Sequence, residues 1–378
     1  MKKIMLAFAG LLAGVTYTYA QSSINIVTTA VPFLRISPDA RAGGMGDLGI
    51  AISPDANAVF WNQAKIPFAK KSGQLALTYT PWLKDLGLND VYLMSASGYK
   101  HLDVEQAVFG SIRFFSLGNI QLTDFSGNIL NNVRPAEFSL DAGYARQINS
   151  NLGISVAMRY INSRLVTGDV GGVVYKAGNA VAGDIALYYQ AAPEGGRGFA
   201  AGLTISNLGT KIGYTNDARN KDFIPANLGL GFSYTTEMDP SNKITFGLDI
   251  NKLLVPAPPV ATGNFTADST ALSDYRSQSV LSSWFKSFGG TSGGMNSLQV
   301  SAGMEYAYNE QFFARGGYFY EDDSRGNRKF FSLGAGFKTS FLTINLSYLV
   351  PSGSGVTRNP LSNTLRFGVM FDIGQDSK

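Results

Sequence analysis

Residues 152–160 read Leu-Gly-Ile-Ser-Val-Ala-Met-Arg-Tyr, with a large apolar residue at every second position and a small or polar residue between. Successive side chains of a β-strand point to opposite faces, so this stretch predicts a strand with one apolar and one polar face. The same alternation recurs at 137–147, 226–235, 242–251 and 298–308. It continues to 362–373, close to the C-terminus.

The pattern predicts fourteen strands in all. They are placed at 74–80, 90–99, 105–115, 137–147, 151–163, 179–190, 198–207, 226–235, 242–251, 298–308, 311–320, 330–338, 341–350 and 362–373. The tight links are 147–151, 308–311 and 338–341, and the long ones are 116–136, 164–178, 208–225, 252–297 and 351–361. Outer-membrane barrels alternate short periplasmic turns with long external loops in this way. We therefore predict an all-β protein, a fourteen-stranded antiparallel transmembrane β-barrel, with its long loops outside the cell.

The start of the chain and its composition support an exported barrel. Residues 1–20 carry Lys2 and Lys3, an apolar run and a small residue at Ala20, which is the pattern of a cleaved signal peptide. No later stretch reaches the roughly 18 unbroken apolar residues of a membrane helix. The absence of cysteine removes a lipid-attachment site, disulfides and thiolate metal sites. Only 15% of the residues are charged, against about 25% in a typical soluble domain, which favours a wall that faces lipid.

Charged residues of the predicted strands share the polar face. They are Arg113, Glu137, Asp141, Arg159, Asp184, Asp249, Glu305, Arg315, Lys338 and Arg366. A lipid-facing Arg or Lys near the membrane centre costs about 2–4 kcal/mol, so these residues are expected to face inward. Five are basic and five acidic, which favours an internal network of ion pairs over an ion-selective pore. Aromatic residues expected at the membrane interfaces are Tyr79, Trp82, Tyr99, Tyr160, Tyr234, Tyr308, Tyr320 and Tyr348.

Residues 21–72 do not follow the strand pattern, and we predict that they form a plug inside the barrel, which occupies 73–378. Their glycine and proline content suits tight turns, with short helices expected after Asp39 and Asp55. This segment also carries the residues of a family resemblance. The runs are Arg-Ala-Gly-Gly-Met-Gly-Asp at 41–47, Asp-Ala-Asn-Ala at 55–58 and Asn-Gln-Ala-Lys-Ile at 62–66.

These runs resemble the long-chain fatty acid transporter (FadL) superfamily, whose members are fourteen-stranded barrels with an N-terminal hatch. Within it, the whole mature chain most resembles the PorV family of the type IX secretion system. The hatch motif Asn-Pro-Ala of the superfamily reads Asn62-Gln63-Ala64 here, which weakens the interpretation as a transporter. The resemblance implies a protein of the cell outer membrane, in contact with its lipid. It implies no catalysis, cofactor or metal.

The implied partners are proteins of the secretion system. The resemblance implies binding to the type IX translocon barrel, to the C-terminal domains of secreted cargo proteins and to the surface attachment complex. The long loop at 252–297 is the best candidate contact, because exposed aromatic residues mark interfaces. Its candidate residues are Pro256, Pro258, Pro259, Trp284, Phe285 and Phe288. An alternative is that these residues fold the loop onto the rim of its own barrel.

Other motifs favour no further chemistry. The match to G-x-G-x-x-G at 44–49 lacks a preceding strand, and the match to G-x-S-x-G at 290–294 lies in a flexible loop. The single histidine, His101, is placed in a periplasmic turn, far from Ser292. The acidic residues at 321–323 are followed by three basic residues in the same loop, so a solvated loop is favoured over a cation site.

The net charge of the mature chain is only +2 once Lys2 and Lys3 are set aside, which gives no indication of nucleic-acid binding.

Two further functions remain open beside secretion. A FadL-like passive uptake channel for hydrophobic small molecules predicts an apolar tunnel, which a polar, charge-paired lumen would count against. An outer-membrane enzyme is least favoured, because the only histidine is badly placed.

Overall fold

The computed structural model describes residues 28–123, 126–170, 172–192, 197–217, 221–289, 295–322, 325–350 and 363–374. The predicted leader at 1–20, the motif at 290–294, Asp323 and the link at 351–361 lie outside the described residues.

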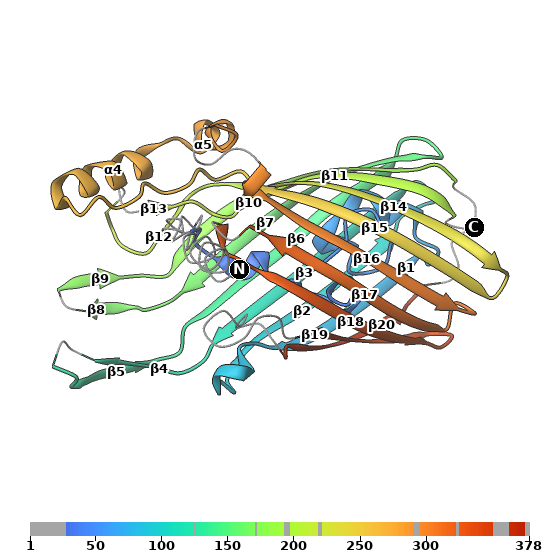
Figure 1. Ribbon diagram of the computed structural model, residues 1–378, viewed down its shortest axis with the longest axis horizontal. Helices are drawn as coiled ribbons and strands as arrows, with labels where there is room; N and C mark the ends of the chain where they lie inside the picture. The colour runs from blue at the N-terminus through green and yellow to red at the C-terminus, as the bar shows by residue number, and fades with distance from the viewer. Residues whose placement is uncertain are drawn as a thin grey trace, which may run out of the picture.

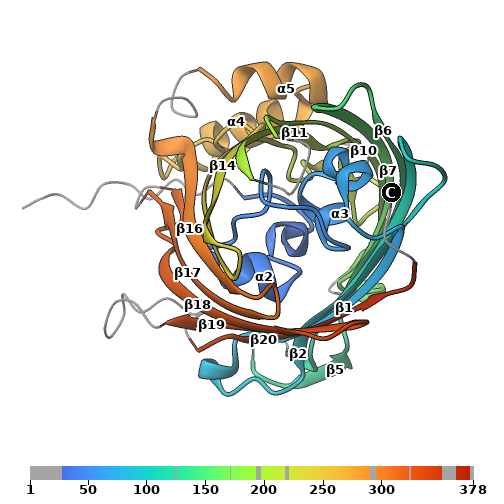
Figure 2. The same ribbon diagram turned by 90° about the vertical axis from the view of Figure 1, so that its right-hand side faces the viewer.

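Fourteen antiparallel strands close into one barrel, in which β1 pairs with both β2 and β20 (Figures 1 and 2). The strands are β1 Gly73–Pro81, β2 Val91–His101, β3 Gln106–Leu117, β6 Ala136–Gln147, β7 Leu152–Arg164, β10 Gly178–Gln190, β11 Gly198–Gly209, β14 Asn227–Asp239, β15 Asn242–Leu253, β16 Leu298–Tyr308, β17 Phe312–Glu321, β18 Lys329–Lys338, β19 Leu342–Val350 and β20 Leu365–Asp372. The predicted fold class and all fourteen strands are confirmed. The largest error is at β14, which was expected to end at 235.

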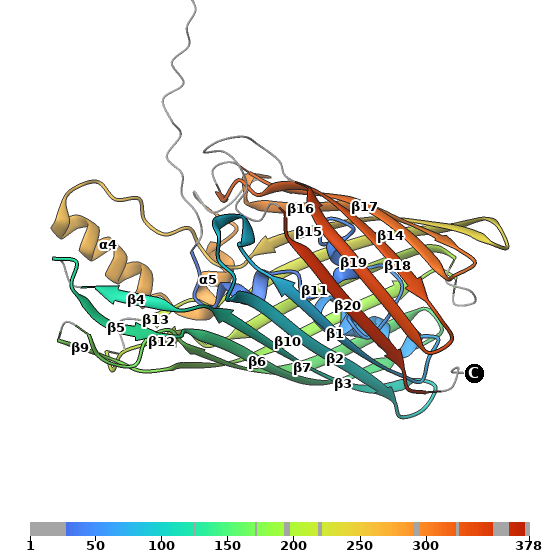
Figure 3. The same ribbon diagram turned by 90° about the horizontal axis from the view of Figure 1, so that it is seen from below.

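The tight turns lie at one end of the barrel, the turn end, and the long connections lie at the other, the loop end (Figures 1 and 3). The long connections contain structure that was not predicted. They hold η3 Lys84–Leu86, the hairpins β4 Ile120–Thr123 with β5 Ile129–Val133, β8 Gly168–Val170 with β9 Val173–Tyr175 and β12 Ile212–Gly213 with β13 Lys221–Asp222, and the helices α4 Phe265–Ser277, α5 Val280–Lys286 and η5 Met295–Ser297. The hairpin strands are too short to show alternation. Because β15 runs to Leu253, the loop begins at 254 and not at 252.

The wall separates apolar from polar side chains as expected. In β7, Met158 is 69% exposed on the outer face, whereas its neighbour Arg159 is buried. Nine of the ten inward charges are buried and the tenth, Lys338, is half-buried. The interfacial placement of Trp82 and Tyr99 was wrong, since both are buried; Tyr99 shares the inner face of β2 with Ser95, Ser97 and His101. None of the described helices is long and apolar enough to cross a membrane.

Residues 30–72, which we call the internal segment, lie within the barrel (Figure 2). The segment contains η1 Pro32–Arg35, α2 Ala40–Gly43, α3 Ala58–Trp61 and η2 Gln63–Phe68. The carboxylate of Asp39 accepts a hydrogen bond from the Ala42 N–H and so caps α2, as the sequence predicts.

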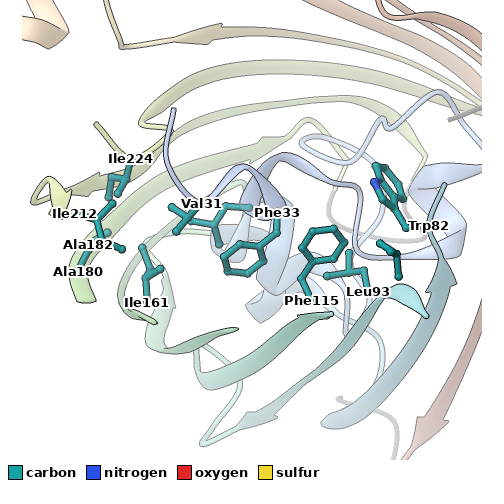
Figure 4. Packing of buried hydrophobic residues seen from close by; sticks show 12 residues of the cluster. Val31, Phe33, Trp82, Leu93, Phe115, Ile161, Ala180, Ala182, Ile212 and Ile224 are labelled. Atoms are coloured by element: carbon teal, nitrogen blue, oxygen red, sulfur yellow. The ribbon is translucent and has the colours of Figure 1, made fainter. Parts of the chain in front are cut away.

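An apolar cluster holds the start of the internal segment against the wall (Figure 4). The ring of Phe33 stacks on that of Phe115 from β3, with centroids 6.5 Å apart and an interplanar angle of 8°. Val31 and Phe33 are almost fully buried. Burial of side chains of this size stabilises by about 1.5–3 kcal/mol each, so the segment is bound to the wall by packing as well as by polar contacts.

Candidate functional site

A network of buried ion pairs joins the internal segment to the wall. The guanidinium of Arg41 donates to Glu305 of β16 from Nε and Nη2, at 3.0 and 2.8 Å, and to Asp55 from Nη1 at 2.8 Å. Arg315 of β17 donates to the same Glu305 carboxylate at 2.6 Å. Buried ions are costly unless every partner is present, so this network favours one position of the segment. Arg41 and Asp55 were not predicted as part of it.

A second set of contacts holds the turn of the internal segment around Ile50 between two charged side chains. Asp249 of β15 accepts hydrogen bonds from the N–H groups of Gly49 and Ile50, at 2.7 and 2.9 Å. The ammonium of Lys65 donates to the carbonyl oxygens of Gly49 and Ile52, at 2.6 and 3.0 Å. Both charged side chains are buried. The inward position of Asp249 followed from strand parity, whereas nothing local to Lys65 indicated its partners.

The predicted hatch residues Asn62, Gln63 and Ala64 are buried at the wall near β10. Asn62 accepts from the Ala64 N–H at the start of η2 and donates to the carbonyl of Leu187 at 2.9 Å. The amide of Gln63 lies 3.4 Å from Asp184. Asp184 is itself 3.0 Å from Arg159, which also pairs with Asp141. These residues therefore attach the segment to a second charged cluster of the wall.

The glycine run of the internal segment serves close packing. Gly46 has φ of 75°, and a Cβ there would lie 2.7 Å from the backbone N of Tyr318 in β17. Across this contact, a Cβ on Gly317 would lie 2.0 Å from the backbone carbonyl carbon of Met45. The match to G-x-G-x-x-G thus marks a place where two backbones touch.

Two other candidates from the sequence are occupied by internal contacts. His101 is the last residue of β2, not a turn residue, and its buried ring N lies 3.0 Å from the carbonyl of Ile66. The carboxylate of Glu321 accepts from Arg328 at 2.7 Å and from Arg35 at 3.2 Å.

At the turn end, Glu310 accepts hydrogen bonds from Lys70 of the internal segment and from Lys243 of β15, at 2.9 and 3.0 Å. Partial burial opposes ionisation of Glu310, but these hydrogen bonds outweigh it and lower its pKa to about 2. The stabilisation should be complete above the ordinary pKa of 4.5 and should be lost as the pH falls towards 2.

We therefore expect the melting temperature of Glu310→Gln to lie below that of the wild type at pH 6 and to equal it near pH 2. Because both groups are about half exposed, the difference should be small, on the order of 1 kcal/mol or less. Circular dichroism at a series of pH values measures it. A constant difference across this range would contradict the assignment.

The loop end presents the helices α4 and α5 beside the barrel rim (Figures 1 and 2). The candidate residues of this loop have different environments. Phe285 and Phe288 are exposed by 78% and 53%, Pro259 is exposed, and Trp284 and Pro258 are half-buried. The expectation that Pro256 is a contact residue was wrong, because it is buried and its carbonyl accepts from the Tyr275 hydroxyl at 3.2 Å.

The buried side of the loop is bound to the neighbouring hairpin. The rings of Tyr275 and Phe223 meet edge to face at 5.5 Å, and Arg276 donates to Asp222 of β13 at 3.1 Å. Lys211 donates to the carbonyl of Arg276 at 2.7 Å. The loop therefore folds onto its own rim on this side through Tyr275 and Arg276, which are not the residues that the alternative interpretation named.

The opposite side of the loop carries exposed apolar residues. Leu281 and Phe285 are one helical turn apart on α5, exposed by 63% and 78%, and Phe288 follows α5. We call Leu281, Phe285 and Phe288 the α5 patch. Leu281 was missed because the helix was not predicted, although Ser279 at its N-cap is a usable signal. Phe265, 87% exposed at the start of α4, was missed for the same reason.

Comparison with known proteins adds the family. The profile of the family described as "Type IX secretion system protein PorV" matches residues 19–260, well over half of the chain. The chain belongs to the PorV family. Membership makes it a component of the type IX secretion system and agrees with the resemblance in the sequence. No curated protein matches the chain.

Solved barrels are similar to this PorV-family chain in fold. The Pseudomonas putida toluene transporter TodX matches with a TM-score of 0.52 and 11% identity, over 89% of this chain and 98% of that one. The monoaromatic hydrocarbon channel CymD matches with a TM-score of 0.51 and 13% identity, over 89% and 97%. A Pseudomonas aeruginosa FadL homologue matches with a TM-score of 0.49 and 11% identity, over 93% of this chain and 100% of that one. Because these identities are low, the similarity to TodX and CymD shows only that the barrel fold is shared.

Proposed function

We propose that this barrel resides in the cell outer membrane and serves type IX secretion by binding proteins. Its partners are the translocon barrel, the C-terminal domains of secreted cargo and the surface attachment complex, to which it passes the cargo. The observation that supports this best is the α5 patch, because apolar side chains exposed beyond the membrane region mark protein contacts. Pro259 and Trp284 lie in the same loop.

The wall of the barrel supports this location. A closed barrel satisfies every backbone hydrogen bond between strands, which is what a lipid environment requires. Outward side chains such as Val156, Met158 and Leu333 are more than half exposed and apolar. In water this surface would drive aggregation, so it supports contact with lipid.

The charged contact between the internal segment and the wall supports binding over uptake. A channel for hydrophobic compounds needs an apolar passage, yet the contact between Arg41, Glu305 and Arg315 is charged, buried and paired. Opening a passage through it would separate these ions at a cost of several kcal/mol. The proposal assigns no covalent chemistry to the barrel.

Copurification tests the proposal. From native cells with an intact type IX system, the tagged wild-type barrel should recover the translocon barrel and cargo. Leu281→Ser with Phe285→Ser should reduce that recovery about tenfold or more, since exposed aromatic anchors carry about 2 kcal/mol or more each. Phe341→Ser is the matched control, because Phe341 is 60% exposed at the turn end, and it should have no effect.

The two possible failures are distinct. If the wild-type barrel recovers neither translocon nor cargo, the function itself is rejected. If the wild type recovers both and the double variant does so equally well, the α5 patch is rejected as the contact while the function stands.

A further inference from the structure

A cavity of about 230 Å³ lies at the turn end, between the internal segment and the wall. Lys70, Glu310 and Arg197 line it and are at least half exposed, so it opens to solvent at this end. Its inner part reaches the buried pair of Arg315 and Glu305. It lies at the opposite end of the barrel from the α5 patch, and the proposed function does not use it.

The charge of this cavity is unbalanced. Among the residues that the structure describes, seven basic and three acidic side chains line it. Two acidic partners stand just outside the lining, Asp372 at 3.8 Å from Lys71 and Glu237 at 2.6 Å from Arg197. With both counted, the described residues leave two positive charges in excess. A concave site with walls of low dielectric constant concentrates such a field and attracts anions.

One lysine stands out among the basic residues. The ammonium of Lys338 is half-buried at the end of β18 and lines the cavity. Within the described part of the chain, it has neither a hydrogen-bond nor an ion-pair partner. The other basic residues named above have acidic partners.

Strand register places suitable neighbours around Lys338. Thr343 of β19 is directly opposite Lys338 on one side and Met370 of β20 on the other. Phe313 of β17 is opposite Gly336, two residues from Lys338 on the same face. All four side chains line the cavity. The group thus combines an ammonium and a hydroxyl with an aromatic ring and a thioether.

We propose that this cavity binds a small organic anion from the turn side. The negative group lies against Lys338 and Thr343, and the apolar body lies between Phe313 and Met370. An engineered cavity of about 150 Å³ holds benzene, so this volume suits a ligand of about nine non-hydrogen atoms. The shared chemistry is one carboxylate or phosphate group on a short apolar body.

Calorimetric titration of the purified barrel in an uncharged detergent tests this site. Benzoate and phenyl phosphate are the anionic probes, and benzyl alcohol is the neutral probe of the same shape. We expect at least one anion to bind about tenfold or more tightly than the alcohol, because hydrogen bonds to charged groups are the stronger ones. Preference for benzoate assigns a carboxylate ligand, and preference for phenyl phosphate assigns a phosphate ligand.

Variants locate the site. Lys338→Met should weaken binding of the preferred anion about tenfold, and Thr343→Val, which keeps the side-chain shape, should weaken it by a smaller factor. Lys176→Met is the matched control, since Lys176 is exposed at the loop end and its ammonium donates to Asn216. Equal binding of anions and alcohol overturns the proposal. The proposal is also overturned if folded Lys338→Met and Thr343→Val both bind the anion as tightly as the wild type does. It is likewise overturned if Lys176→Met weakens binding as much as Lys338→Met does.

Discussion

Replacing Arg41 by methionine releases the internal segment from the barrel wall. The variant leaves the carboxylate of Asp55 without its Arg41 partner and leaves Glu305 with Arg315 alone. Removal of one member of a buried ion-pair network costs about 3–5 kcal/mol, because the remaining charges stay desolvated. Since the strand ladder of the wall does not involve Arg41, we expect this cost to appear as opening of the segment before the barrel unfolds.

Thiol labelling measures this opening. The chain has no cysteine, and Ser37 is a suitable reporter because it is buried and its hydroxyl has no hydrogen-bond partner within the described residues. In a Ser37→Cys background, Arg41→Met should raise the labelling rate at least about 100-fold. The control Arg146→Met removes an exposed ion pair of 3.8 Å with Glu105 and should leave the rate unchanged. Equal rates for all three proteins would show that the network does not hold the segment.

Replacing Gly317 by alanine destabilises the protein, whereas the same change at Gly316 does not. A Cβ on Gly317 points into the barrel and would meet the backbone of Met45 at 2.0 Å. Backbone cannot move aside by changing a rotamer, so we expect a loss of about 3 kcal/mol, the upper part of the range for overpacked sites. A Cβ on Gly316 meets nothing within 4 Å.

Unfolding in denaturant and the Ser37→Cys labelling rate report this difference. Gly317→Ala should unfold at lower denaturant and label faster than the wild type. Gly316→Ala should stay within about 1 kcal/mol of the wild type, because alanine in a strand is slightly favoured over glycine. Equal losses of stability in the two variants would mean that both glycines are needed for the strand itself and not for contact with the internal segment.

Most of the wall could be predicted from single strands. Side chains alternate with a period of two, so the inward positions of Arg159 and Asp249 follow from the sequence around each. The same rule applied to β2 places Tyr99 inward with Ser95 and Ser97, and the error at Tyr99 came from preferring residue type over parity.

The loop end was harder to predict, for a different physical reason. Phe285 and Phe288 were identified by residue type and are exposed. Pro256 was misplaced because its burial depends on Tyr275, which is brought to it by a helix that alternation of residues cannot reveal. The stability of short helices and two-residue strands comes from the neighbours they pack against.

By itself, the sequence determined that this chain forms a closed barrel and belongs with the PorV family. These properties are carried by local patterns, which repeat along the chain and need no partner to be recognised. Only the tertiary structure decided which charges meet. Arg41 and Glu305 are 264 positions apart in the sequence. Such contacts exist once the barrel has closed around the internal segment, because closure brings distant residues within a few ångströms of each other.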